Sequence, residues 1–153
     1  MQFNQTQIRD TIGISVETFR HWQRVLPPFS GRKKYTLGDL LAAGVLRRLT
    51  DHCGVRAGYL PEISKAIVEV CNANAWASLQ DKTFIIDIQK KTCALAKSVS
   101  AFSFQDVMVV CPLEGIMAQI HEHLSHKESV VAQHHLRFPP ISVGGQRTQR
   151  QHV

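Results

Sequence analysis

The sequence lacks the features that mark a membrane or exported protein. It contains no run of about eighteen apolar residues, so no transmembrane helix is expected. The first residues, Met1 to Gln5, form neither a basic leader nor an apolar stretch and are not typical of a secretory signal. The length of 153 residues is enough for one domain, or for a small head with a second unit. We therefore expect a globular protein of the cytoplasm.

Cysteine and histidine are present, but without the spacing that a reactive or metal-binding site requires. The four cysteines are far apart with no Cys-x-x-Cys pair, which favours reduced, mostly buried thiols (Cys53, Cys71, Cys93 and Cys111). His121, His123 and His126 lie near the end of a predicted helix, but no cysteine or carboxylate completes a metal set. No oxyanion motif accompanies Cys111 and His121. We expect no metal, no cofactor and no enzyme activity.

Acidic residues are scarce in the first part of the chain. Residues 1–60 hold nine Lys and Arg against four Asp and Glu, whereas residues 61–153 hold nine against eight. The excess positive charge is therefore concentrated in the N-terminal part, and a one-sided basic head predicts a polyanionic partner. Charge alone does not separate nucleic acid from a membrane or from a merely solvated surface.

Two short helices are predicted at the N-terminus. Thr6 can cap a helix that runs to Ile12, and Gly13 suits the positive φ at a helix C-terminus. Ser15 can cap a second helix over Val16–Val25. Two short helices joined by a turn that contains glycine are typical of a helix-turn-helix.

The next segment breaks the helical pattern and then resumes it. Two prolines and a glycine in residues 26–35 predict a short hairpin with three consecutive cations near its tip. Thr36 can cap a longer helix from Leu37 to about Cys53, and a further helix is predicted over about Leu60–Ala75.

After Trp76 the pattern changes to β-branched and aromatic residues. Thr83–Ile88 suits a strand, and Thr92–Val99 and Val107–Cys111 are weaker strand candidates. A helix follows from about residue 112. The predicted fold is α+β and mostly α. It has an N-terminal winged helix-turn-helix head (1–76), a small strand and helix unit (77–128) and a flexible, disordered tail (129–153).

The head resembles the DNA-binding region of the MerR family. Over Gly13–Arg24, a Gly-hydrophobic-Ser turn precedes Thr, a hydrophobic residue, Arg, two aromatic-type residues and a closing Arg. Arg32–Tyr35 and the following Thr36–Leu40 are similar to that family's wing, tyrosine and next helix. The resemblance covers about residues 5–70. It implies that Arg20 and the wing residues Arg32 to Tyr35 clamp the DNA backbone.

The residue types in the second helix favour the same interpretation. Phe19 and Trp22 can anchor the helix, while Glu17, Thr18 and His21 could reach base edges in a major groove. Arg20 and Arg24 are better placed for phosphates, and a helix N-terminus at Ser15 can also hold one. The predicted DNA-binding residues are Ser15, Glu17, Thr18, Arg20, His21, Arg24, Arg32, Lys33, Lys34 and Tyr35.

Two departures restrict what the resemblance implies. Arg9 occupies a first-helix position where the family usually has a small residue. A strand at Phe84–Ile88 replaces the long coiled-coil helix that typically follows the head, so the usual dimer arm and promoter-untwisting mechanism are not carried over. Pairing of the Thr83–Ile88 strand across a twofold axis is one way in which the second unit could form a dimer.

Three functions remain open from the sequence. The first is a sequence-specific transcription regulator, a repressor that binds a pseudo-palindromic operator as a homodimer in the nucleoid. The second is a phage or mobile-element architectural or DNA-processing protein of the excisionase or terminase small-subunit type. The third is a protein-interaction module in which the basic surface is incidental. Salt dependence of binding separates the third from the other two.

Overall fold

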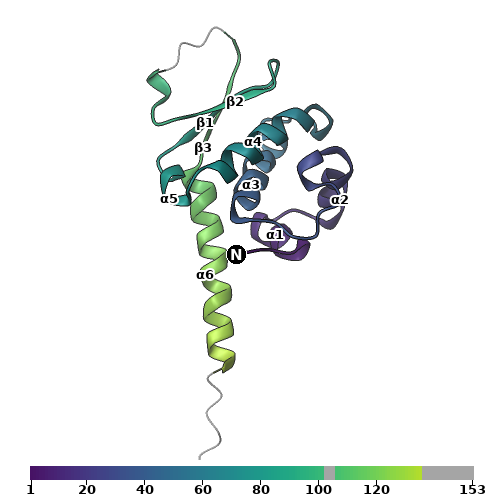
Figure 1. Ribbon diagram of the computed structural model, residues 1–153, viewed down its shortest axis with the longest axis vertical. Coiled ribbons are helices and arrows are strands. Elements are labelled where there is room, and N and C mark those ends of the chain that lie inside the picture. Colours follow the sequence, from purple (N-terminus) through teal and green to yellow (C-terminus); the bar gives the residue numbers. More distant parts are fainter. Residues whose placement is uncertain (102–105, 136–153) are drawn as a thin grey trace, which may run out of the picture.

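The computed structural model describes residues 1–101 and 106–135 (Figure 1). This part of the chain is α+β and mostly helical, as predicted. The α-helices are α1 (Gln5–Ile12), α2 (Val16–Val25), α3 (Leu37–Asp51), α4 (Pro61–Ala73), α5 (Trp76–Leu79) and α6 (Glu114–His135). The short 3-10 helices are η1 (Pro27–Phe29), η2 (Ala57–Tyr59) and η3 (Val99–Ala101). Across the described ranges, no helix is long and apolar enough to span a membrane.

The three predicted strands form one antiparallel sheet. They are β1 (Thr83–Asp87), β2 (Thr92–Ala96) and β3 (Val109–Pro112), in the order β2-β1-β3. Ile85 of β1 pairs with Ala94 on one side and with Val110 on the other. Because both edges of β1 are already paired, the expected pairing of this strand across a twofold axis is wrong. The outer edges of the sheet belong to β2 and β3.

Local hydrogen bonds set the limits of the first two helices. α1 begins two residues earlier than predicted, because Asn4 rather than Thr6 is its cap and exchanges two hydrogen bonds with Gln7. Gly13 ends α1 with φ of 74°, as predicted. The Ser15 hydroxyl oxygen accepts the Thr18 backbone N–H at 3.1 Å and fixes the start of α2.

The segment between α2 and α3 does not form the predicted hairpin. Pro27 and Pro28 open η1 instead, since proline has no N–H to donate to a strand ladder. Tyr35, at the far end of the segment, pairs with Phe3 through two backbone hydrogen bonds of 2.8 Å. The extended partner of Tyr35 is therefore Phe3, near the N-terminus, and not a second strand of a hairpin.

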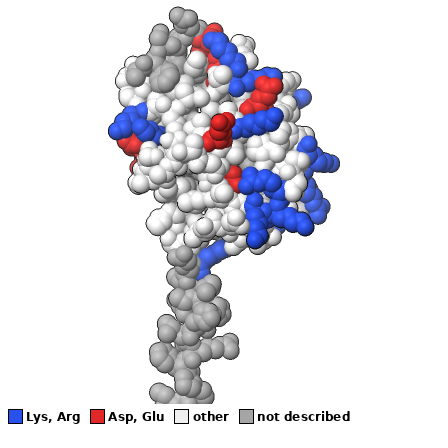
Figure 2. All heavy atoms as spheres, viewed as in Figure 1, with Lys and Arg blue, Asp and Glu red and all other residues white. Residues whose placement is uncertain are grey.

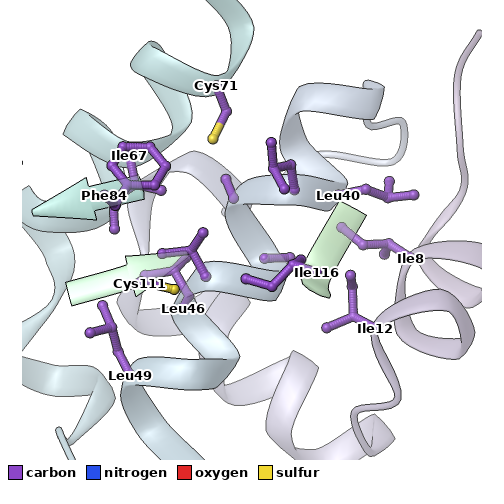
Figure 3. Packing of buried hydrophobic residues seen from close by; sticks show 14 of the residues in the cluster. Ile8, Ile12, Leu40, Leu46, Leu49, Ile67, Cys71, Phe84, Cys111 and Ile116 are labelled. Carbon is purple, nitrogen blue, oxygen red and sulfur yellow. The ribbon is translucent and has the colours of Figure 1, made fainter. Parts of the chain in front are cut away.

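A single hydrophobic cluster extends across both predicted units (Figure 3). Ile116 from α6 packs against α1 and α3, close to Ile12 and against Gly44. A Cβ at Gly44 would overlap the Ile116 side chain, so only glycine lets α6 lie this close to α3. The head and the second unit consequently share one core.

The last helix is longer than predicted. α6 extends away from the rest of the molecule and continues to His135, past the expected start of the flexible tail at residue 129 (Figure 1). The rest of the predicted tail, from residue 136, lies outside the described residues.

Candidate nucleic-acid interface

The inner side of α2 is fixed by an aromatic cluster. Phe19 and Trp22 are 2% and 1% exposed. The Phe19 ring meets Phe29 of η1 and Tyr35 edge to face, with ring centroids 6.1 and 5.8 Å apart. The ring centroids of Trp22 and Phe29 are 5.9 Å apart. Such contacts between buried rings restrict the rotation of α2 about its own axis.

The outer side of α2 is polar and open to solvent. Glu17, Arg20, His21 and Arg24 are exposed, and Thr18 is half-buried. Neither arginine makes an ion pair with any described residue. Figure 2 shows Lys and Arg side chains gathered on the side of the molecule where Figure 1 places α2. The helix thus presents cations that no neighbouring carboxylate neutralises.

Ser15 and Thr18 are already engaged with each other. Besides the capping bond, the two side-chain hydroxyl oxygens lie 3.0 Å apart and are hydrogen-bonded. The Ser15 hydroxyl therefore serves the helix cap. An anion at this end of α2 would be held by the remaining N–H groups of the first turn.

The three cations of the next segment have different surroundings. Lys33 and Lys34 are exposed and make no ion pair within the described ranges. Arg32 instead contacts the Asp39 carboxylate at 2.6 Å, donates to the Pro28 carbonyl at 3.1 Å and lies 5.1 Å above the Tyr35 ring. Of the three cations, only Lys33 and Lys34 have no carboxylate partner among the described residues.

Tyr35 lies in the core, although it was predicted as a DNA contact. It is 0% exposed, and its hydroxyl donates to the Arg32 carbonyl at 2.8 Å. Burial raises its pKa, so the phenol stays protonated and keeps this bond. In this conformation Tyr35 is enclosed in the core, whereas Arg32 is partly exposed and is held by Asp39 and the Pro28 carbonyl.

Asp39 is the centre of the network that positions the two lysines. The Asp39 carboxylate accepts hydrogen bonds from Arg32, from the Thr36 backbone N–H at 2.8 Å and from the Asn72 side-chain amide at 3.0 Å. Burial alone would raise its pKa, but the hydrogen bonds from Arg32, Thr36 and Asn72 outweigh burial and hold the pKa below 3.8. The charged carboxylate therefore ties the segment to α3 and α4.

The loop between α3 and α4 adds two residues that the sequence interpretation did not assign. A groove of about 690 Å³ separates α2 from this loop, with Thr18 and His21 on one wall and Arg56 and Tyr59 on the other. Tyr59 is 67% exposed, and Arg56 makes no ion pair with the described residues. The available signal was an arginine between two loop glycines, Gly54 and Gly58, with a tyrosine directly after the second glycine.

The described part of the chain offers no cluster of metal ligands at this surface. Among the described residues, no group of three or more His, Cys, Asp and Glu side chains could hold a metal ion. The Nδ1 atom of His121, on α6, lies 3.4 Å from the Ser125 hydroxyl oxygen.

The chain matches no family model, no curated protein and no solved structure.

Proposed function

We propose that this protein is a MerR-like, sequence-specific transcription regulator that binds double-stranded DNA. The segments from α1 to α4 would act as a helix-turn-helix head, with α2 as the recognition helix and the Lys33–Lys34 segment in the position of a wing. The protein would act as a repressor and bind as a homodimer on a pseudo-palindromic operator, because twofold symmetry doubles the contacts.

One observation carries this proposal. α2 buries Phe19 and Trp22 and leaves Arg20, His21 and Arg24 exposed, as a helix that enters a major groove requires. Lys33 and Lys34, which follow α2 in the sequence, add two further positive charges that have no ion pair among the described residues. Any helix at a protein surface buries one side in the same way. The distinguishing feature of α2 is that the arginines on its outer side have no carboxylate partner among the described residues.

The exposed groups suggest a division of roles. Glu17 is able to accept from a cytosine amino group, and His21 is able to hydrogen-bond purine edges, so these residues would read sequence. Arg20, Arg24 and the two lysines would contact phosphates, which set register and affinity. Arg32 and Tyr35 would support the lysine-bearing segment from inside.

The dimer would use a surface other than β1. β3 lies at one edge of the sheet, and the Val110 side chain on this strand is 41% exposed. An unpaired edge strand is a ready site for pairing with another chain. We therefore assign the second unit, and not the head, to dimer formation.

The experiment is selection of bound duplexes from a random pool, followed by affinity measurements over a range of salt concentrations. We expect an enriched, pseudo-palindromic sequence and affinity that falls steeply with salt. Arg20→Gln should weaken binding to all duplexes, whereas His21→Asn should change the preferred sequence. Lys65→Gln, at an exposed position of α4, is the matched control and should change neither. Salt-independent binding to a protein partner, with no affinity for DNA, would contradict the proposal.

A further inference from the structure

A separate cavity lies where the head meets the second unit. It has a volume of about 330 Å³ and is bounded by the C-terminal part of α3, by β3 and by the start of α6. Its walls are mainly apolar and include Leu49, Val109, Cys111 and Pro112. Figure 3 shows Leu49 and Cys111 near each other at this junction. The size and lining are those of a small-molecule site.

Two basic side chains stand at the edge of this apolar cavity. Arg48 lies in the last turn of α3 and His52 caps the C-terminal end of this helix. Both also line a second cavity of about 160 Å³ between α3 and α6. Arg48 is exposed and makes no ion pair within the described ranges. No acidic side chain is among the residues that line either cavity.

The Arg48 guanidinium lies beside the cavity, with Nη2 4.0 Å from the Cβ position of Gly115. Burial raises the pKa of the Cys111 thiol to about 11, and the positive charge of Arg48 opposes this rise. The guanidinium is therefore close enough to act on the apolar wall. A cation next to apolar walls, without a carboxylate to neutralise it, favours a ligand that combines an apolar body with a negative charge.

We propose that this pocket binds a small carboxylate with an apolar body, such as an aryl or branched aliphatic acid. The carboxylate would accept hydrogen bonds from Arg48 and His52, and the apolar body would lie between Leu49, Val109 and Pro112. The proposal concerns a surface away from α2, so it does not depend on whether α2 binds DNA.

Gly115 offers a way to fill the pocket without disturbing the fold. It lines the cavity at the first turn of α6, and a Cβ built there meets only the Arg48 guanidinium, at 4.0 Å. The Cβ of Gly115→Val therefore has space, and its two γ-methyl groups would occupy ligand space. Lys65→Gln removes a positive charge elsewhere on the surface and serves as the control for Arg48→Gln.

The test is titration of the full chain with phenylacetate, phenylacetamide and phenethylamine, followed by backbone amide chemical shifts. We expect phenylacetate to shift amides of α3 near His52, of β3 and of the first turn of α6. Phenylacetamide should bind about tenfold more weakly, and phenethylamine should produce no shifts there. Arg48→Gln should weaken phenylacetate binding about tenfold, Gly115→Val should abolish it and Lys65→Gln should leave it unchanged.

Two results would overturn the proposal. One is the absence of localised shifts with phenylacetate at millimolar concentration. The other is equal binding of all three probes, which would mean that charge plays no part. DNA affinity is measured in a separate experiment. A chain that binds phenylacetate but no DNA refutes the proposed function alone, and the reverse result refutes the pocket alone.

Discussion

The cations around α2 and those of the sheet differ in their partners. Arg20, Arg24, Lys33 and Lys34 make no ion pair with any residue that the structure describes, whereas the lysines just before and just after β2 each meet a carboxylate. Lys90 lies 3.1 Å from Asp106, Lys91 lies 3.6 Å from Glu62 and Lys97 lies 3.6 Å from Asp81.

This difference decides which face carries a long-range field. The fields of two opposite charges a few ångströms apart largely cancel at distances well beyond their separation, whereas the field of an unpaired charge persists until salt screens it, over about 10 Å at moderate salt. The sheet therefore contributes little positive potential despite its lysines. The face formed by α2 and the following segment keeps its potential, so position and partners matter more than the number of basic residues.

The largest predicted effect comes from removing unpaired charge. Lys33→Gln with Lys34→Gln should lower DNA affinity by at least about tenfold and reduce the slope of log affinity against log salt by about 2. Lys90→Gln with Lys91→Gln removes the same charge from the sheet and should change neither quantity much. Equal losses from the two double variants, measured by fluorescence anisotropy, would show that only net charge matters.

A second prediction compares a buried ion pair with an exposed one. Asp39→Asn should lower the free energy of unfolding by about 1–2 kcal/mol, because Arg32, Thr36 and Asn72 lose a charged acceptor. Glu62→Gln breaks the exposed pair with Lys91 and should cost less than about 0.5 kcal/mol. Urea denaturation measures both. Similar values for the two variants would contradict the role of Asp39 as the anchor of the lysine-bearing segment.

The same carboxylate makes a prediction about pH. The pKa of Asp39 is lower in the folded chain than its ordinary value of 3.8, so its stabilising contribution is fully present above that value. The contribution is lost as pH falls from about 4 through the folded-state pKa. Asp39→Asn should therefore be less stable than the natural chain near neutral pH and lose less stability on acidification. Parallel acid denaturation curves for the two proteins would rule out this linkage.

Much of the helical structure could be predicted because local chemistry determines it. The start and the buried side of α2 are determined by residues close together in the sequence. These features are the positive φ at Gly13, the cap at Ser15 and the spacing of Phe19 and Trp22. The same spacing leaves the arginines outside. The three strands were likewise predicted from local composition, although not their order in the sheet.

The remaining features depend on residues far apart in the sequence. The partner of Tyr35 is Phe3, and the carboxylate that holds Arg32 comes from the following helix. These contacts bury Tyr35, an expected DNA contact, and engage Arg32 in an ion pair within the chain. No local pattern could show that Arg56 would lie across a groove from His21, since the course of the chain through α3 brings them together.

The smallest predicted effect tests how far the unpaired face extends. If DNA that follows α2 also passes the loop between α3 and α4, Arg56→Gln should reduce the salt slope by about 1 and affinity severalfold. Stability should not change, because Arg56 is exposed and makes no ion pair within the described ranges. Lys97→Gln is the matched control, since it removes a cation that already has a carboxylate partner. An unchanged salt slope in Arg56→Gln would confine the interface to α2 and the lysine segment, because a phosphate contact cannot be lost without releasing fewer counterions.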